Sequence, residues 1–374
     1  MKIAVNTRLL LHNRLEGIGR FTFETLYQIT RNHSEHQFIF IFDRPYHESF
    51  IFSDNILPVV LPPQARHPLL YIAWFEYSMP RLLSRQKPDL FLSPDGYLSL
   101  KSNLPSISVI HDLNFEEYPD DLPWAERIYY QRMFPRFAEK ARRIATVSEF
   151  SKQDIVRRYG IPESKIDVVH NGSSKHFRPL EEGEKMAVKK QFSRNCPYFF
   201  FIGSLHPRKN LVNLFKAFDQ FKVADHLGIK LVIAGARMWW TNEIRSAFDS
   251  MHYRDEVIFT GRVTDEDLAR LMASALALTY VSYFEGFGIP ILEAFQCGTP
   301  VITSNITSMP EVAGDAALLV DPFSVDAITE AMHFIADDPV LRNLLIEKGN
   351  RQKELFSWKS TSEKLWKTIE QSLS

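Results

Sequence analysis

Short apolar runs alternate along the chain with longer segments in which apolar residues recur every three or four positions. The short runs are typical of buried β-strands, and the longer segments are typical of amphipathic helices. Strands are predicted in the first half at residues 2–6, 37–42, 89–93, 106–111, 143–147 and 165–169. Strands are predicted in the second half at residues 198–203, 230–235, 257–260, 276–280, 300–303 and 317–320. The clearest helical patterns cover residues 20–31, 123–140, 211–221 and 265–273.

This strand–helix–strand alternation with short turns predicts an α/β fold with parallel sheets covered by helices on both faces. Twelve strands fit two sheets of about six better than one sheet. Gly, Ser, Pro and many charges gather in residues 170–195, just before a new buried strand begins. We therefore expect one domain over residues 1–178 and a second over residues 179–358. A final amphipathic helix, over about residues 359–374, is expected to pack back on the first domain.

The composition is that of a globular chain of 374 residues, 45% of them hydrophobic, with a net charge of −1. These values argue against a disordered chain and against a general nucleic-acid binder. The presence of two cysteines, Cys196 and Cys297, argues against a disulfide framework and against a multi-thiolate metal site. No uncharged apolar run reaches the roughly 18 residues that span a bilayer. The N-terminal apolar stretch is too short and too broken for a signal peptide, so we expect a cytoplasmic protein.

The first segment whose residues could bind a ligand is Glu16-Gly17-Ile18-Gly19-Arg20, directly before a predicted helix. Glycines at a helix N-terminus let backbone N–H groups approach an anion closely, and the helix dipole assists. The run GIGRFT lacks the third glycine of a dinucleotide-binding fingerprint. Phosphate binding and an ordinary glycine-containing turn both remain open on this pattern alone.

The second segment, Gly203 to Leu211, ends the first strand of the second half and contains Arg208 and Lys209. Adjacent cations at the carboxyl end of a parallel strand suit a diphosphate, because ligands of open α/β sheets bind at that edge. A solvated charge pair is the other interpretation. Cations at a helix start oppose the helix dipole, however, so a negative group is expected beside them.

The third and most specific segment runs from Glu285 through Gly286, Phe287, Gly288, Ile289 and Pro290 to Glu293. Pro290 suits the first turn of a helix, and the glycines form a tight loop before it. The helix start is an anion site, and carboxylates beside it are good acceptors for sugar or ribose hydroxyls. A plain surface position for Glu293 is disfavoured by its apolar neighbours.

Three further features have competing interpretations. His111, at the end of a strand, could contact a substrate hydroxyl or pair structurally with Asp112. Asp265-Glu266-Asp267 resembles a metal-binding Asp-x-Asp, but Thr264 before it predicts a helix N-cap instead. The helix around residues 127–143 carries several Arg and Lys with interleaved aromatic residues. A solvated face is the first interpretation there, and contact with an anionic membrane surface is the second.

Taken together, these motifs resemble the retaining glycosyltransferases of family four, the group 1 glycosyltransferases with the GT-B fold. The resemblance is nearly end to end, and it includes the GIGRFT loop, HDLNF at 111–115, RRIATVSEFSKQDI at 142–155, VVHNGSSKHFRP at 168–179, GSLHPRKNL at 203–211, VIAGAR at 232–237, EGFGIPILEA at 285–294, CGTPVITSNITSMPEVAGDAALLVDP at 297–322 and FSW at 356–358. The most similar subgroup includes mannosyltransferases that build bacterial surface polysaccharides such as O-antigen.

The resemblance implies two Rossmann-like domains facing each other across a cleft, with a nucleotide-diphosphate sugar held mostly by the second domain. Arg208 and Lys209 would neutralise the diphosphate, and Gly17 and Gly19 would add backbone N–H groups from the other side. The remaining implied roles are donor-sugar contacts by Glu285, Phe287 and Gly288, phosphate proximity of Ile289, ribose binding by Glu293, base contacts by the backbone of Arg262 and Val263, and a place beside the donor sugar for His111.

The family implies transfer of a hexose with retention of configuration, without a metal or other cofactor. GDP-mannose is the first expectation for the donor and a UDP-sugar such as UDP-glucose the second. The sequence departs from the family at His206, where many relatives carry an acid, and in the run GARMWW. Met238 and Trp239 in that run leave the donor nucleotide open. The expected acceptor is a saccharide or a lipid-linked saccharide, and a lipid-linked acceptor would bring the protein into peripheral contact with the membrane.

Other classes fit the residues less well. A nicotinamide-dependent oxidoreductase is disfavoured by the incomplete glycine fingerprint. A phosphorylase on the same fold would need a lysine motif for pyridoxal phosphate, and none is recognisable. A sugar-nucleotide-binding protein without catalysis would not be expected to keep His111, Arg208, Lys209, Glu285 and Glu293 together.

Overall fold

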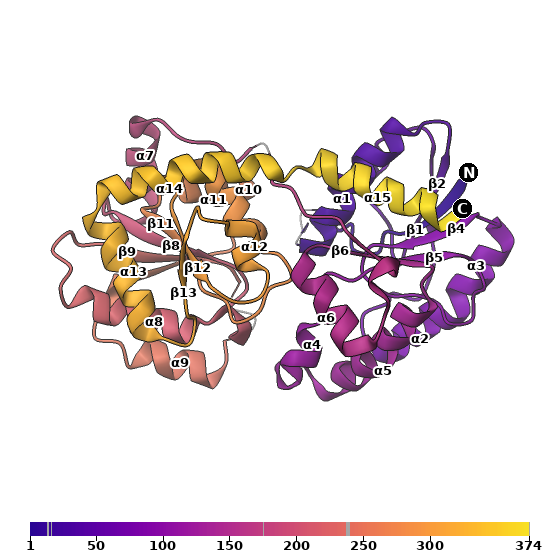
Figure 1. Ribbon diagram of the computed structural model, residues 1–374, viewed down its shortest axis with the longest axis horizontal. Coiled ribbons are helices and arrows are strands. Elements are labelled where there is room, and N and C mark those ends of the chain that lie inside the picture. The colour runs from indigo at the N-terminus through magenta and orange to yellow at the C-terminus, as the bar shows by residue number, and fades with distance from the viewer. Residues whose placement is uncertain (13–14, 16, 175, 237–239, 374) are drawn as a thin grey trace. The chain divides into compact units, whose positions relative to one another are not determined.

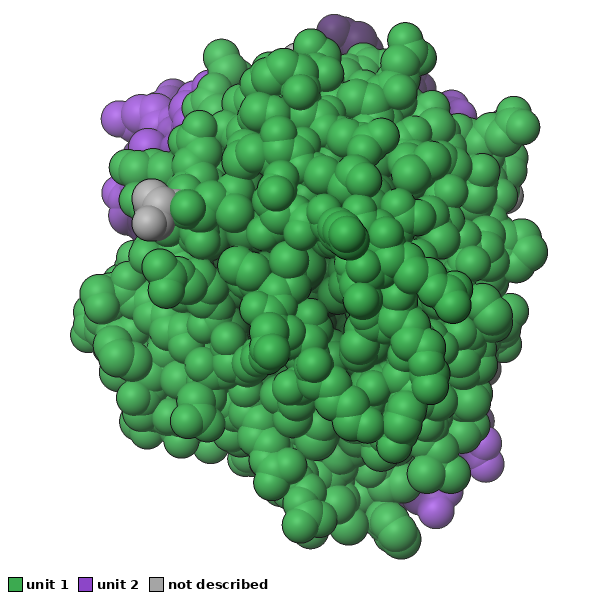
Figure 2. Space-filling model, turned by 90° about the vertical axis from the view of Figure 1, so that its right-hand side faces the viewer, with its two compact units in different colours: residues 1–171, 357–374 green, residues 172–356 purple. Residues whose placement is uncertain are grey.

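The protein is described by a computed structural model that covers residues 1–12, 15, 17–174, 176–236 and 240–373. It divides into two compact units. Unit 1 comprises Met1–Asn171 and Ser357–Ser374, and unit 2 comprises Gly172–Phe356 (Figure 2). The sequence-based boundaries were 178/179 and 358/359.

Unit 1 is built on a seven-stranded parallel sheet of order β3-β2-β1-β4-β5-β6-β7. Its strands are β1 (Lys2–Asn6), β2 (Gln37–Phe42), β3 (Ile56–Val60), β4 (Leu90–Ser93), β5 (Ser106–Val109), β6 (Arg143–Thr146) and β7 (Ile166–Val168). Its helices include α1 (Gly17–Asn32), α2 (Pro68–Ala73), α3 (Met79–Gln86), α4 (Asn114–Glu117), α5 (Trp124–Lys140), α6 (Glu149–Tyr159) and α15 (Trp358–Leu373).

Unit 2 is built on a six-stranded parallel sheet of order β10-β9-β8-β11-β12-β13. Its strands are β8 (Tyr198–Ile202), β9 (Lys230–Ala234), β10 (Val257–Gly261), β11 (Ala277–Tyr280), β12 (Val301–Ser304) and β13 (Leu318–Val320). Its helices include α7 (Glu182–Phe192), α8 (Leu211–Lys222), α9 (Asn242–Asp249), α10 (Asp265–Ser274), α11 (Ile289–Cys297), α12 (Met309–Ala313), α13 (Val325–Asp337) and α14 (Pro339–Gln352). Helices α8, α9 and α13 cover one face of the sheet, and α7, α10, α11 and α14 cover the other (Figure 1).

The predicted fold class is confirmed: both units are parallel sheets between helix layers, and all twelve predicted strands are present. One strand was missed. Strand β3 reads ILPVV, and the proline in its centre argued against a strand. It lies at the edge of the unit 1 sheet and pairs only with β2, where Pro58 stands opposite Phe40. An edge position is where a sheet tolerates a residue without an N–H donor.

Covering both faces of a parallel sheet explains why its strands read as continuous apolar runs. Strand β8 reads YFFFI, and Tyr198, Phe199, Phe200 and Phe201 are all fully buried. Consecutive side chains point to opposite faces, so this strand supplies aromatic packing to both helix layers. The apolar core of unit 2 is therefore centred on the strand that leads directly into the Arg208 and Lys209 segment.

The carboxyl ends of β8 and β9 approach each other closely. The N–H of Gly203 donates to the carbonyl of Ala234, and the N–H of Gly235 donates to the carbonyl of Gly261. A Cβ on Gly235 would lie 1.8 Å from the backbone oxygen of Gly203, and Gly235 has a φ of +152°. Only glycine fits there, and this close approach sets the edge from which the functional loops of unit 2 start.

Helix α15 lies in unit 1, beside α1 (Figure 1). Its apolar stripe is buried, with Leu365 and Ile369 fully covered. Trp366 stacks on His33 of the segment after α1, with ring centroids 3.6 Å apart. The last helix of the chain is thus part of the core of the N-terminal sheet.

Candidate functional site

The main polar cluster of unit 2 lies at the carboxyl ends of β8 and β11. Lys209 ends a short 3₁₀ turn, Pro207–Lys209, that follows β8. Its ammonium Nζ donates to the hydroxyl of Tyr280 at 2.6 Å and to Oε1 of Glu285 at 2.5 Å. Tyr280 is the last residue of β11, and Glu285 follows in the next loop. Lys209 and Glu285 are both more than nine-tenths buried, so their charges interact in a largely dry environment.

Arg208 completes the cluster. Its Nη1 donates to the carbonyl oxygen of Phe284 at 3.2 Å and to Oε2 of Glu285 at 3.3 Å. The carboxylate of Glu285 is therefore shared by two cations. This is the negative partner that the sequence required beside Arg208 and Lys209.

The pKa values of both Glu285 and His206 are lowered in this cluster. Burial raises the pKa of Glu285, but the charges of Lys209 and Arg208 outweigh burial and bring it to about 2. Burial and the same two cations lower the pKa of His206 to about 4. Near neutral pH the cluster therefore contains two cations, one carboxylate and a neutral imidazole. This is an arrangement suited to binding an anion with adjacent hydroxyls.

Asn210 ties the loops of this edge together. It has a left-handed backbone with a φ of +59° and caps the start of α8. Its side-chain amide donates to the carbonyl of Val281 at 2.9 Å and to the carbonyl of Pro322 at 2.7 Å. The loops after β8, β11 and β13 are thus held in one position. The sequence analysis did not single out Asn210 or Tyr280. Their signal was position, since each lies at the carboxyl end of a buried strand.

The glycine-rich segment after β11 has the predicted shape. Gly288, with a φ of +99°, precedes the first turn of α11, and Pro290 lies in that turn. Phe287 is buried and packs edge-on against Phe356, with ring centroids 5.7 Å apart. Ile289 is half-buried at the start of the helix. The loop is therefore anchored by aromatic packing while the helix N-terminus follows directly behind it.

Glu293 lies one turn into α11 and is 7% exposed, so it is not a surface residue. Its charge contributes to the raised pKa of both Tyr280 and Cys297, in each case after burial as the larger cause. The Glu293 charge therefore acts on Tyr280, the phenol whose hydroxyl accepts from Lys209.

The segment after β10 contains the remaining candidates of unit 2. Arg262 is exposed and Val263 is half-buried. The next residue, Thr264, accepts a hydrogen bond at Oγ1 from the N–H of Asp267 at 3.1 Å and caps α10, as predicted. Among the described residues, no group of three or more His, Cys, Asp or Glu side chains could hold a metal ion.

In unit 1, Gly17 and Gly19 lie in the first turn of α1, where backbone N–H groups have no carbonyl partner within the helix. Gly19 is also required sterically, because a Cβ there would lie 2.7 Å from the carbonyl oxygen of Leu9. Glu16, Met238 and Trp239 fall outside the described residues.

His111 follows β5 and is half-buried. Its Nε2 is hydrogen-bonded to the carbonyl oxygen of Pro94 at 2.8 Å, and Phe21 of α1 packs edge-on against its ring at 5.0 Å. The carboxylate of Asp112 accepts instead from the N–H of Asn114 at 3.1 Å. Burial is the main cause of a lowered pKa of His111, so its neutral form is favoured. His111 and the two glycines therefore belong to unit 1, and the other candidates belong to unit 2.

The basic helix α5 has both buried and solvent-exposed apolar side chains. Arg127 forms an ion pair with Asp120, while Tyr129 and Phe134 are buried in the core of unit 1. Trp124 and Ile128 are 72% and 51% exposed. No helix within the described part of the chain has the length and apolarity needed to cross a membrane.

Comparisons with known proteins agree with this architecture. The model of the family "Glycosyltransferase Family 4" matches residues 16–174, and that of "Glycosyl transferases group 1" matches residues 183–352. The O-antigen chain mannosyltransferase B of Escherichia coli is 31% identical over 275 residues, which cover 73% of this chain and 72% of that protein. The O-antigen chain mannosyltransferase RfbU of Salmonella typhimurium is 29% identical over 213 residues, 57% of this chain and 56% of that protein.

Among solved structures, Alr3699/HepE of Anabaena, in complex with UDP and glucose, superposes with a TM-score of 0.78. The match covers 99% of each chain at 14% sequence identity, so it shows that the fold is shared.

Proposed function

The chain belongs to the group 1 glycosyltransferases, glycosyltransferase family 4, and on that premise we propose that it transfers mannose from GDP-mannose to a saccharide acceptor during polysaccharide synthesis. The main support for this proposal is the buried cluster of Arg208, Lys209 and Glu285. It combines a pair of cations suited to an anion with a carboxylate that can accept from hydroxyl groups. Two similar proteins are named as O-antigen chain mannosyltransferases, and this supports mannose as the sugar.

In the proposed reaction, Arg208 and Lys209 hold the diphosphate and stabilise the negative charge that develops on it as the sugar leaves. The N–H groups of Phe287, Gly288 and the start of α11, together with Glu285, contact the hydroxyls of the donor sugar. Ile289 lies beside the phosphates, Glu293 accepts from the ribose hydroxyls, and the backbone at Arg262 and Val263 faces the base. In unit 1, Gly17 and Gly19 offer N–H groups to the phosphates, and His111 accepts a hydrogen bond from a hydroxyl of the sugar.

The proposed stereochemistry is retention. The acceptor oxygen forms a bond to the anomeric carbon on the face from which the diphosphate departs, and the bond from that carbon to the phosphate oxygen breaks. The proton of the acceptor hydroxyl goes to the leaving phosphate. Because the cations of the site are side chains, we propose that no metal is required. Nuclear magnetic resonance of the product should show the donor's α-configuration, and a β-linked product would contradict the mechanism.

The first experiment is a thermal-shift panel with GDP, UDP, ADP and NAD. A ligand that binds only the folded state at about 100 times its dissociation constant adds roughly 2.7 kcal/mol. For a domain of 150–250 residues this corresponds to roughly 5–11 °C in Tm. Stabilisation by GDP alone supports the proposal, and UDP alone would favour a UDP-sugar donor. Stabilisation by NAD alone, or by none of the four, would contradict it.

A pair of variants tests the site itself. Lys209→Ala should remove the stabilisation by GDP and lower the rate of transfer by orders of magnitude. Lys216→Ala removes an exposed lysine from α8 and serves as the matched control. Equal responses of the two variants to GDP would show that binding does not depend on this cluster.

A further inference from the structure

A tight turn in unit 1 follows strand β4 at Ser93-Pro94-Asp95-Gly96. The N–H of Gly96 donates to the carbonyl of Ser93 at 3.3 Å, which closes the turn. Proline at the second position and Gly96, with a φ of +88°, suit this geometry. The turn fixes where the Pro94 carbonyl points, and this carbonyl is the hydrogen-bond partner of His111.

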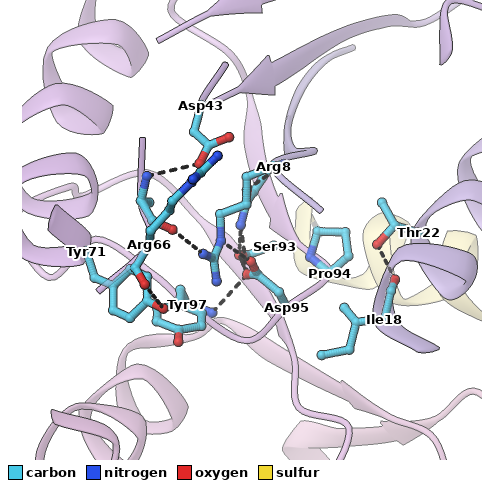
Figure 3. A network of polar contacts seen from close by, with 12 residues as sticks. Arg8, Ile18, Thr22, Asp43, Arg66, Tyr71, Ser93, Pro94, Asp95 and Tyr97 are labelled. Carbon is cyan, nitrogen blue, oxygen red and sulfur yellow. Dashed lines mark hydrogen bonds and ion pairs between the residues drawn. The ribbon is translucent and has the colours of Figure 1, made fainter. Parts of the chain in front are cut away.

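The side chain of Asp95 organises the turn from inside the unit (Figure 3). Its Oδ1 accepts from Nδ2 of Asn6 at 2.7 Å, from Oγ of Ser93 at 3.0 Å and from the N–H of Tyr97 at 3.4 Å. Its Oδ2 accepts from Nε of Arg8 at 2.5 Å. Asp95 is 7% exposed, so this carboxylate connects the ends of β1 and β4 in the absence of bulk water.

Arg8 is equally buried and comes from the segment after β1. Its Nη1 donates to the carbonyl of Ala65 at 3.0 Å. Its guanidinium lies over the rings of Tyr97 at 4.5 Å, Tyr71 at 5.2 Å and Phe75 at 5.8 Å. Both charged partners thus have several fixed contacts, which a buried ion pair needs in order to be stable. The pair therefore supports the turn that carries the Pro94 carbonyl.

The hydrogen bond to Pro94 determines the chemistry of His111. A carbonyl oxygen can only accept, so Nε2 of His111 carries the proton. In the neutral ring the lone pair is then on Nδ1, which makes that atom an acceptor. Phe21 packs against the ring, and Oγ of Ser151 donates to the backbone carbonyl of His111 at 3.0 Å. The ring therefore has one tautomer and one orientation.

We propose that Asp95 and Arg8 are positioning residues: they hold the Ser93–Gly96 turn so that the Pro94 carbonyl keeps His111 in the Nε2–H tautomer, with Nδ1 presented to a substrate hydroxyl. The assignment of the hydroxyl rests on the proposed function, whereas the tautomer does not. Asp95 is expected to act through His111 and to make no contact with the substrates itself. Removing Asp95 leaves the turn with the hydrogen bonds of Gly96 to Ser93 and Ser108, and the loosened Pro94 carbonyl then lets the ring exchange between tautomers.

The first test is spectroscopic and uses the full chain labelled with ¹⁵N-histidine. Long-range ¹H–¹⁵N correlation distinguishes the two tautomers, and His111→Gln identifies the His111 signals. The wild-type protein should show the Nε2–H form, and Asp95→Ala should show a mixture. Asp95→Asn keeps an acceptor oxygen for the turn, should shift the tautomer less, and also serves if the alanine variant does not fold. Asp120→Asn is the matched control, because it removes an exposed carboxylate of unit 1 whose described partner is Arg127 of α5.

The second test uses turnover and exploits non-additivity. Asp95→Ala should lower kcat by roughly 10- to 100-fold, by analogy with the range seen when the partners that orient metal-ligating histidines are removed. It should change the KM for the donor much less. His111→Gln can still donate to Pro94 but has no ring nitrogen at the Nδ1 position. In that background, Asp95→Ala should cost less than about twofold, because residues that act as a unit are not additive.

Two results would overturn the proposal. One is an unchanged tautomer in both Asp95 variants, and the other is an equal loss of kcat in the wild-type and His111→Gln backgrounds. A wild-type protein that shows the Nε2–H tautomer, loses it in Asp95→Ala and transfers no sugar would refute the proposed function but support the positioning role.

Discussion

Replacing Lys209 by methionine removes one charge from the buried cluster and preserves much of the side chain's length. The variant leaves the Glu285 carboxylate with Arg208 as its remaining cation, and Arg208 contacts it at 3.3 Å, whereas Lys209 does so at 2.5 Å. Lys209 is also the larger of the two charge contributions to the low pKa of Glu285. Burial, which raises that pKa, would then be opposed much more weakly.

The pKa of Glu285 gives the scale of the effect. At about 1.4 kcal/mol per pKa unit, the difference between 4.5 and about 2 corresponds to roughly 3 kcal/mol in favour of the ionised carboxylate. Breaking a buried pair by removing one partner costs about 3–5 kcal/mol in general. We therefore expect Lys209→Met to destabilise the protein by roughly 3 kcal/mol at pH 7. In a domain of this size, that lowers Tm by about 6–12 °C.

Calorimetry of four proteins tests this reasoning: wild type, Lys209→Met, Glu285→Gln and the double variant. The double variant has neither charge, so it should regain most of the stability that Lys209→Met loses. Lowering the pH towards 5 should also help Lys209→Met, because the Glu285 carboxylate, which has lost its shorter contact to a cation, then takes up a proton more readily. Two results would refute the electrostatic account. One is a Tm of Lys209→Met within about 2 °C of the wild-type Tm. The other is a double variant whose loss of stability equals the sum of the two single losses.

The remaining predictions concern other parts of the chain. Gly235→Ala should prevent folding of unit 2, seen as loss of its calorimetric transition, whereas Gly183→Ala, with open space around the added methyl group, should be tolerated. Thr264→Ala should lower the free energy of unfolding by about 1 kcal/mol by removing a helix cap, measured by urea titration. The folded pKa of Glu285 lies below its unfolded value, so its contribution to stability is complete above pH 4.5 and is lost as the pH falls towards 2; Glu285→Gln should therefore flatten that part of the stability–pH curve. Dialysis against a chelator should leave sugar transfer unchanged, and activity restored only by added Mg²⁺ or Mn²⁺ would contradict the metal-free mechanism.

The sequence was sufficient for the fold because burial on both faces of a parallel sheet leaves an unambiguous pattern. Strand β8, with its aromatic run, could be located to within a residue. Strand β3 could not, since Pro58 is acceptable only at a sheet edge, and an edge is defined by strands far away in the sequence. Strand order is likewise a property of the packed sheet and cannot be read from local periodicity.

The candidate site was predictable to the same extent. Glycines, cations and acids at strand ends could be singled out from their positions, and Glu293 could be recognised as buried from its apolar neighbours. The pairing of Glu285 with both cations could not be predicted, because Glu285 follows Lys209 by more than seventy positions in the sequence. The tautomer of His111 depends in the same way on a carbonyl seventeen residues away.

The two polar clusters share one physical feature, which links stability to the proposed chemistry. In unit 2, Lys209 is already held by Glu285 and Tyr280, and in unit 1, His111 is already held by Pro94. Ordering and desolvation of these side chains are thus completed during folding and are not repeated when a ligand binds. A preorganised site should lose activity and stability together when a support such as Lys209 or Asp95 is removed. On the proposed function, Lys209→Met should therefore lose folding stability, because Glu285 has one cation fewer, and also affinity for the donor diphosphate.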